Sequence, residues 1–186
     1  MSTIKNETEL GGMLGESVSV RKVNGRVVLK NRPQRKTDIR SDKQLKYKKK
    51  FLLASQYANR QLDLEEARAL YAAAAIGPRQ TAYTVAVRDF LVAPTVEAIN
   101  TSEYHGQIGD QIVVTALDDF MVTKVKVTIT SAAGNVIEEG EAGPDAEGVF
   151  PWVYKATVAN PTLTGTKILA VAYDRPGNKG SEEVVL

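Results

Sequence analysis

Two short runs near the N-terminus, residues 17–23 and 26–30, alternate between polar and apolar residues on either side of Asn24-Gly25. Alternation with period two predicts β-strands, and Asn-Gly between such runs predicts a two-residue hairpin turn, which needs positive φ at both central residues. The apolar face of this hairpin then carries Val18, Val20, Val27 and Leu29. An isolated hairpin is marginally stable in water, so this face is expected to pack on the rest of the chain or on another molecule.

A longer helical pattern follows the polar residues after Pro33. Ser41 with Gln44 has the form of a capping box, and it predicts a helix that runs to about Arg60. We expect the interior face of this helix to carry Leu45, Phe51, Leu52, Tyr57 and Ala58. Its outer face would be basic and would carry Lys43, Lys46, Lys48, Lys49 and Lys50.

Two further segments before residue 94 have helical features. Asp63 with Glu66 repeats the capping box ahead of an alanine-rich run that should stop at Gly77-Pro78. Residues 80–92 contain β-branched residues in alternation, which favours a strand, but the spacing of their apolar residues also fits a helix that ends before Pro94. We favour the helix.

From residue 94 onward the pattern changes to short β-prone runs separated by turn residues. Seven such runs in about 90 residues are typical of an immunoglobulin-like sandwich. The predicted strands are 96–100, 111–116, 122–130, 136–141, 150–157, 166–173 and 181–186. The predicted fold class is therefore α+β: an extended arm with a β-hairpin in residues 1–40, a helical region in 41–93, and an all-β immunoglobulin-like sandwich in 94–186.

Charge divides the chain in a way that its net charge of +2 conceals. Residues 21–50 hold 13 Lys and Arg against two acids, while residues 91–186 hold 13 acids against six bases. Such a distribution is informative about partners, whereas net charge mainly affects solubility. The basic part that includes the hairpin also contains Arg32, Arg35, Lys36 and Arg40.

The residues needed for common catalytic and metal sites are scarce. The chain has no cysteine and one histidine, His105, so it cannot build a thiolate site or a two-histidine metal site by itself. No phosphate-binding glycine loop or nucleophile elbow is present, and the glycines at 11, 12 and 15 are better explained by a flexible arm. Asp118-Asp119 would begin a turn rather than bind calcium. Glu138-Glu139 would lie in or beside a strand, with one of the two pointing outwards, as part of a solvated face. We expect no cofactor, no small-molecule substrate and no enzymatic activity.

Several motifs in the C-terminal half carry a resemblance. Asp118-Asp119-Phe120-Met121-Val122, Glu138-Glu139-Gly140 and the turn Ala172-Tyr173-Asp174-Arg175-Pro176-Gly177-Asn178 resemble bacterial immunoglobulin-like domains. The arm, with its glycines, hairpin and basic helix, looks like structural proteins of Bacteroidota and their phages. The resemblance implies a module used for adhesion, display or assembly, and it implies no catalytic site.

Two functions fit these observations. In the first, the basic arm of one subunit meets the acidic sandwich of the next and builds an oligomer, a filament or a phage-like particle. In the second, the basic residues of segment 21–50 bind nucleic-acid phosphates. We prefer assembly because one chain carries both complementary surfaces, although the arm could also pack on its own sandwich. No signal peptide or membrane span is evident, so we expect a cytoplasmic protein, possibly incorporated into a particle, with no membrane partner.

Overall fold

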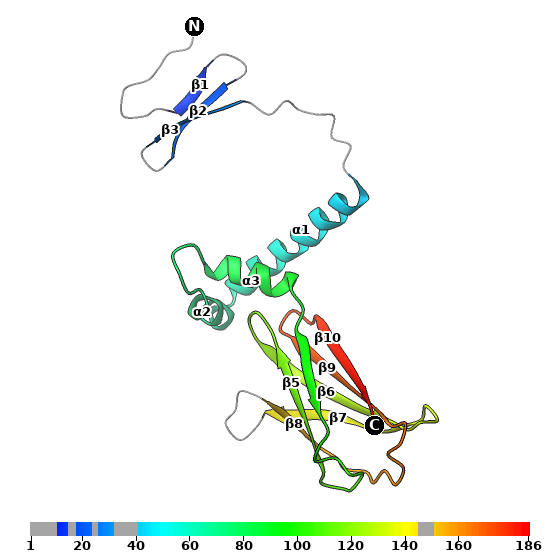
Figure 1. Cartoon of the computed structure of the whole chain (residues 1–186). Coiled ribbons are helices and arrows are strands. Elements are labelled where there is room, and N and C mark those ends of the chain that lie inside the picture. Colours follow the sequence, from blue (N-terminus) through cyan, green and yellow to red (C-terminus); the bar gives the residue numbers. More distant parts are fainter. Residues whose placement is uncertain (1–10, 15–17, 24–25, 32–40, 145–150) are drawn as a thin grey trace. The chain divides into compact units, whose positions relative to one another are not determined.

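The protein combines a small N-terminal sheet, three helices and a β-sandwich, which confirms the predicted α+β class (Figure 1). The structure is a computed structural model, and it describes residues 11–14, 18–23, 26–31, 41–144 and 151–186. The chain divides into two compact units, residues 1–43 and residues 44–186. The second unit contains the helices, apart from the first residues of α1, together with the whole sandwich.

The N-terminal sheet has three antiparallel strands in the order β1-β2-β3. The strands are β1 (Gly11–Leu14), β2 (Val18–Val23) and β3 (Arg26–Asn31). The predicted hairpin is confirmed, since Val20 lies opposite Leu29 and Lys22 lies opposite Val27. Strand β1 was not predicted, because glycines weaken the strand pattern of its sequence. It pairs along the other edge of β2, with Gly12 opposite Val20.

The helical region consists of α1 (Asp42–Asp63), α2 (Glu65–Ala73) and α3 (Ala82–Leu91). The helical interpretation of residues 80–92 is confirmed, and α3 begins with a capping box. In this box the Thr84 backbone N–H donates to the Thr81 hydroxyl (3.2 Å), and the Thr81 N–H donates to the Thr84 hydroxyl (2.8 Å). The capping box predicted at Asp63 is wrong. Helix α1 continues through Asp63, and α2 starts after Leu64 with no side-chain cap.

Small residues allow the three helices to approach one another closely. The buried cluster between them contains Ala54, Ala58, Ala67, Tyr71, Val85, Ala86 and Val87. Tyr71 is the largest fully buried side chain of this cluster, and its ring stacks on Phe120 of the sandwich with ring centroids 4.4 Å apart. A loop of the sandwich therefore contributes to the helical core.

The seven predicted strands of the sandwich are all present. They are β4 (Thr95–Asn100), β5 (Gln111–Leu117), β6 (Val122–Thr130), β7 (Val136–Pro144), β8 (Trp152–Lys155), β9 (Lys167–Asp174) and β10 (Lys179–Val185). They are hydrogen-bonded in the order β10-β9-β6-β7-β8-β5-β4. Strand β7 pairs with β6 along most of its length and with β8 at Gly143 and Pro144, so it joins the two sheets. Lettered A to G along the chain, the strands form the two sheets ABED and CFG of an immunoglobulin-like sandwich.

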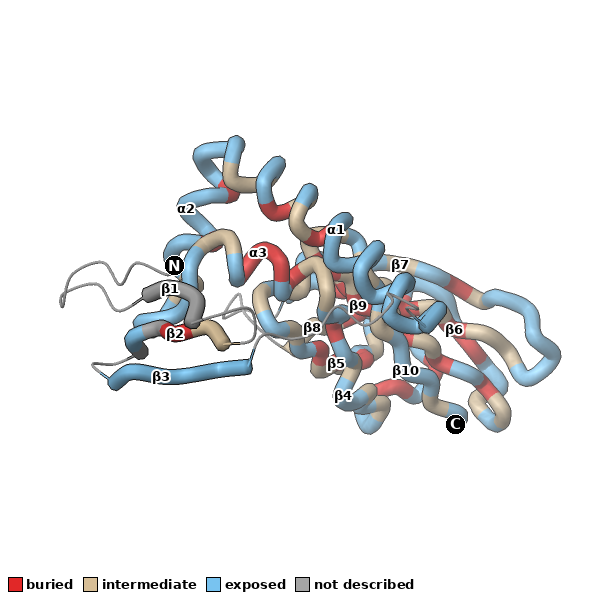
Figure 2. Tube along the Cα trace, turned by 90° about the horizontal axis from the view of Figure 1, so that it is seen from above, coloured by how far each residue is buried: buried red, intermediate tan, exposed pale blue. Residues whose placement is uncertain are grey.

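Buried residues alternate with more exposed ones along the strands of the sandwich core. On β6, Val125, Val127 and Ile129 are fully buried, and the residues between them are partly exposed. On β9, Ile168, Ala170 and Ala172 are likewise fully buried (Figure 2). The partly buried Trp152 packs against the edge of this core.

In the pair Glu138-Glu139 one member points outwards, as predicted, but the other does not lie on a solvated face. Glu139 is exposed and pairs with Lys126 across the strands at 2.6 Å. Glu138 lies opposite the buried Ile129 and is itself buried. Its Oε2 accepts hydrogen bonds from the Tyr154 hydroxyl (2.9 Å) and from the backbone N–H (2.8 Å) and hydroxyl (2.7 Å) of Thr157. These donors offset the cost of burying the carboxylate.

Candidate interaction surface

The apolar face of the hairpin is only partly covered in the structure. Val20 is buried and Val18 is half-buried on the central strand β2, but Val27 and Leu29 on β3 are 48% and 64% exposed. Val28 on the opposite face is also exposed. The β3 strand therefore presents aliphatic side chains that would be stabilised by a partner. Four other predicted site residues, Arg32, Arg35, Lys36 and Arg40, lie outside the described residues.

The predicted interior face of α1 is wrong for most of its residues. Of the five residues expected there, only Ala58 is buried and Tyr57 is half-buried. Every residue from Ser41 to Leu53 is exposed, and the first turns of the helix appear pale blue in Figure 2. The exposed apolar residues of this half are Leu45, Tyr47, Phe51, Leu52 and Leu53. The predicted outer residues Lys43, Lys46, Lys48, Lys49 and Lys50 are exposed as well.

The lengths of the helices explain why half of α1 is uncovered. At 1.5 Å per residue, α1 is roughly 33 Å long, whereas α2 and α3 are each only about 15 Å long. Ala54 and Ala58, which contact the other helices, lie in the C-terminal half of α1. Lys50 reaches the end of α3, where its Nζ donates to the Leu91 carbonyl oxygen at 2.9 Å. Residues before Lys50 extend past this contact.

The apolar residues of the exposed half lie on more than one side of α1. The successive spacings along the series Tyr47, Phe51, Ala54 and Ala58 are four, three and four residues. All four residues therefore lie on the same helix face. Leu45 and Leu52, which are seven residues apart, share a different face. Tyr47 is 63% exposed and Phe51 is 55% exposed. The face of α1 that is buried at Ala54 and Ala58 is therefore exposed to solvent at Tyr47 and Phe51.

We call the exposed apolar residues Leu45, Tyr47, Phe51, Leu52 and Leu53 of α1 the N-terminal apolar surface, and Val27 and Leu29 of β3 are a separate apolar patch in the first unit. The surface on α1 was missed because Leu45, Phe51 and Leu52 were assigned to an interior face. The signal that could have identified them is the length of the apolar pattern, which exceeds what two short helices can cover. No helix among the described residues is both long and apolar enough to cross a membrane.

Three acids of the sandwich form ion pairs within the sandwich itself. Ion pairs join Lys124 to Glu141 (3.4 Å), Lys126 to Glu139 (2.6 Å) and Lys167 to Glu183 (3.4 Å). All three pairs are exposed, so each stabilises the sheet only weakly. The excess of acids over bases in residues 91–186 therefore acts as a diffuse negative field rather than as one charged pocket.

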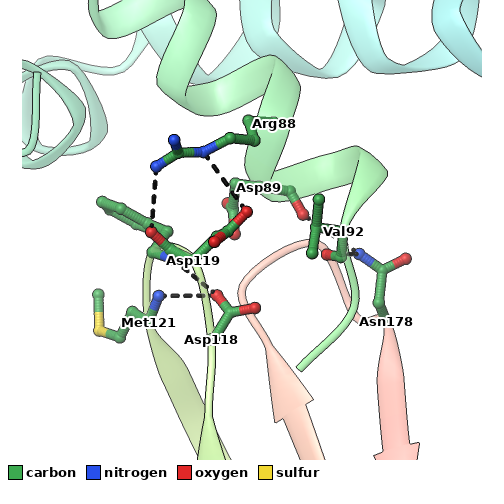
Figure 3. A network of polar contacts seen from close by, with 8 residues as sticks. Arg88, Asp89, Val92, Asp118, Asp119, Met121 and Asn178 are labelled. Atoms are coloured by element: carbon green, nitrogen blue, oxygen red, sulfur yellow. Dashed lines mark hydrogen bonds and ion pairs between the residues drawn. The ribbon is translucent and has the colours of Figure 1, made fainter. Parts of the chain in front are cut away.

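Polar contacts hold the helical region on the sandwich (Figure 3). The Asn178 side-chain amide donates to the carbonyl oxygens of Asp89 (3.3 Å), Phe90 (3.3 Å) and Val92 (3.4 Å) at the C-terminal end of α3. Asp174 fixes Asn178 by accepting from its backbone N–H and its side-chain amide, both at 2.6 Å. These bonds satisfy helix carbonyls that have no partner within α3.

A second set of contacts lies on the other side of α3. The Arg88 guanidinium pairs with the Asp119 carboxylate at 3.5 Å and donates to the Asp119 carbonyl oxygen at 3.3 Å. Asp118 Oδ2 accepts from the backbone N–H of Phe120 (3.0 Å) and of Met121 (2.9 Å), so Asp118 begins a turn, as predicted. No group of three or more His, Cys, Asp or Glu is arranged to hold a metal ion among the residues that the structure describes.

A chain of buried hydroxyl and carboxyl groups at this junction was not predicted from the sequence. The Tyr71 hydroxyl donates to Asp89 Oδ2 at 2.5 Å, and the Tyr57 hydroxyl lies 2.9 Å from the Tyr71 hydroxyl. Asp89 is 1% exposed. Burial, together with the nearby carboxylates of Asp118 and Asp174, raises the pKa of Asp89 to about 6. Burial and the bond to Asp89 raise the pKa of Tyr71 far above its ordinary value, so Tyr71 remains a donor.

Comparison with known proteins leaves the family of this chain open. No family model matches the chain, and no curated protein matches it. A solved structure described as a tetra-tandem repeat in the extending region of a large adhesion protein is similar to half of the chain, with 21% sequence identity and a TM-score of 0.33. The match covers 50% of this chain and 23% of that structure. At this TM-score the similarity supports neither a fold nor a function for this chain.

Proposed function

We propose that this chain is a non-enzymatic structural protein that self-assembles through its N-terminal segment. The observation that supports this most strongly is the N-terminal apolar surface, in which the Tyr47 side chain is 63% exposed and the Phe51 side chain is 55% exposed on one helix. Contiguous exposed apolar residues on a folded protein are typical of interaction sites. A second copy of the chain is the proposed partner.

Burial of apolar side chains would supply most of the affinity. Aromatic residues near the centre of an interface commonly contribute 2 kcal/mol or more each to binding. Tyr47 and Phe51 are placed for this role because they project beyond the part of α1 that α2 and α3 cover. The resemblance of the arm to phage-type structural proteins of Bacteroidota indicates the kind of assembly proposed, a particle or a filament.

Charge would set the direction of the contact. The basic residues 21–50 of one copy are attracted to the negative field of residues 91–186 of the next, which gives a head-to-tail contact. Because the acids of the sandwich are spread over its surface and three of them are already paired with lysines, this attraction would mainly accelerate association and set its orientation. Assembly should therefore slow as salt increases.

Removal of residues 1–40 tests the proposal. The remaining chain keeps α1 and both buried clusters, so it is expected to fold. We expect it to associate more weakly than the full chain in light scattering, because it lacks Val27 and Leu29 of β3 and the basic residues of the arm. The proposal is wrong if the shortened chain associates as strongly as the full chain at the same concentration.

Nucleic-acid binding is the second candidate, and the lysines of α1 favour it. Lys43, Lys46, Lys48 and Lys49 are exposed and form no ion pair with an acid in the described part of the chain. The exposed Tyr47 ring among them is a surface on which a base could stack. Phosphates would be the natural counter-charges for such a cluster.

A mobility assay separates the two candidates. If the lysines bind phosphates, single-stranded or duplex DNA should be retarded at about 50 mM salt and released above about 300 mM, because each contact releases counterions. A Lys46→Gln and Lys49→Gln variant should then bind more weakly and show a shallower dependence on salt. Lys167→Gln and Lys179→Gln in the sandwich provide the matched control. Absence of a shift at about 50 mM salt excludes this candidate.

A further inference from the structure

The contact between α3 and the sandwich contains a carboxyl group that is poorly provided with donors. Asp89 is buried on the last turns of α3, and its Oδ2 accepts one hydrogen bond, from Tyr71. Its Oδ1 has no hydrogen-bond partner among the described residues. A buried carboxylate usually needs several donors or a cation to offset its desolvation. Asp89 lacks this compensation when it is charged.

The groups that face Asp89 come from every element packed against it. Tyr57 of α1 and Tyr71 of α2 contribute hydroxyl groups whose pKa values are raised, so both hydroxyls remain neutral in the ordinary pH range. The sandwich contributes the carboxylates of Asp118 and Asp174, which repel a charge on Asp89, and the more favourable Arg175. Arg88, the neighbour of Asp89 on α3, is already paired with Asp119.

The hydrogen bonds made by Arg175, Asp174 and Asp118 do not remove the repulsion between the carboxylates of Asp118 and Asp174 and a charged Asp89. Arg175 Nε donates to Gln61 of α1 at 3.2 Å. Asp174 is held by Asn178, and Asp118 by backbone N–H groups of its own turn. Asp118 Oδ1 is also buried without a hydrogen-bond partner among the described residues. Two poorly compensated carboxyl oxygens therefore occur on opposite sides of the contact between helices and sandwich, as Figure 3 shows for Asp89 and Asp118.

We infer that this contact is a proton-dependent joint, in which a proton on the Asp89 carboxyl tightens the packing of the helical region on the sandwich and loss of that proton loosens it. This pH effect is distinct from self-assembly itself. It would nevertheless affect the exposed surface of α1, because α1 is part of the same helical region. The pH would then control how firmly the N-terminal apolar surface is held relative to the sandwich.

The direction of the pH effect follows from the pKa values. The folded-state pKa of Asp89, about 6, is above its ordinary value of 3.8, so the folded protein binds the proton more tightly than the unfolded chain. The stability that this proton contributes is fully present below about pH 3.8 and is lost as pH rises through about 6. Between pH 5 and pH 7, this group alone should increase the unfolding equilibrium constant about tenfold.

Urea unfolding of the full chain at pH 5 and pH 7 tests the inference, with Asp89→Asn as the variant. The amide can still accept from Tyr71 but carries no charge, so we expect the tenfold difference to disappear. Asp119→Asn is the matched control, since Asp119 is a half-exposed carboxylate in the same network. It should retain the difference. Equal pH dependence in the wild type and in Asp89→Asn would overturn the inference.

Two measurements on the unaltered protein cover the case in which Asp89→Asn fails to fold. NMR titration of the side-chain carboxyl carbon should give Asp89 a midpoint above pH 5, and a midpoint below pH 4.5 would overturn the inference. Hydrogen exchange, corrected for the intrinsic rate, should show weaker protection of α1–α3 at pH 7 than at pH 5, with β6 and β9 unchanged. A uniform change, or none, would contradict a joint located at this contact.

Discussion

A chain that carries Phe51→Gln and Leu52→Gln is expected to stay folded and to lose its self-association. Both side chains are more than half exposed, so their replacement removes little packing within the chain. Glutamine preserves the helix propensity and the charge of α1. If each residue contributes about 2 kcal/mol to the contact between copies, the dissociation constant should rise roughly 1,000-fold. Sedimentation velocity over a concentration series measures this shift.

The matched control for this variant is Leu64→Gln with Leu70→Gln. These residues are also exposed and apolar, but they lie next to or within α2, outside the N-terminal apolar surface. The control should associate like the wild type. If both double variants weaken association equally, the effect is general surface hydrophobicity, and α1 has no specific part in assembly.

Gly180→Ala is expected to destabilise the sandwich by about 3 kcal/mol, which is large for one added methyl group. Strand β10 passes close to the start of β4 at this point. A Cβ on residue 180 would lie 1.8 Å from the carbonyl oxygen of Pro94, which is itself buried. The obstacle is backbone, so no side-chain rotation can relieve the clash, and the two strands must separate.

Thermal unfolding measures this change, and about 3 kcal/mol corresponds to a decrease in Tm of about 6 to 12 °C for a chain of this size. Gly143→Ala is the matched control, because an added Cβ there meets nothing within 4 Å and the backbone is not in a positive-φ conformation. It should leave Tm within about 2 °C of the wild type. A small effect of Gly180→Ala would mean that β4 and β10 are less closely packed than described.

Local patterns were sufficient to predict most of the elements. The alternation on β6 and β9 predicted which residues are buried, since neighbouring strands are covered evenly along their length. Asn24-Gly25 predicted the pairing of Val20 with Leu29 because a two-residue turn determines the register of both strands. Thr81 and Thr84 form the capping box that begins α3, and this box favours a helix in a segment whose alternation also fits a strand.

The errors concern properties that depend on distant parts of the chain. Whether Phe51 is buried depends on how far α2 and α3 extend along α1, and no local pattern contains that information. Glu138 is buried because Tyr154 and Thr157, which are distant in sequence, supply its donors. Asp89 likewise lies among groups from α1, α2 and two sandwich loops. Its sequence neighbours, an arginine and a phenylalanine, do not indicate a buried carboxyl group.

We propose that the N-terminal apolar surface joins copies of this chain. The mass of the unaltered full chain in solution, measured by light scattering at low salt over a wide range of concentration, tests this proposal. We expect a mass that rises with concentration to a multiple of the 20.2 kDa of one chain. A mass that stays at 20.2 kDa up to high concentration would contradict it.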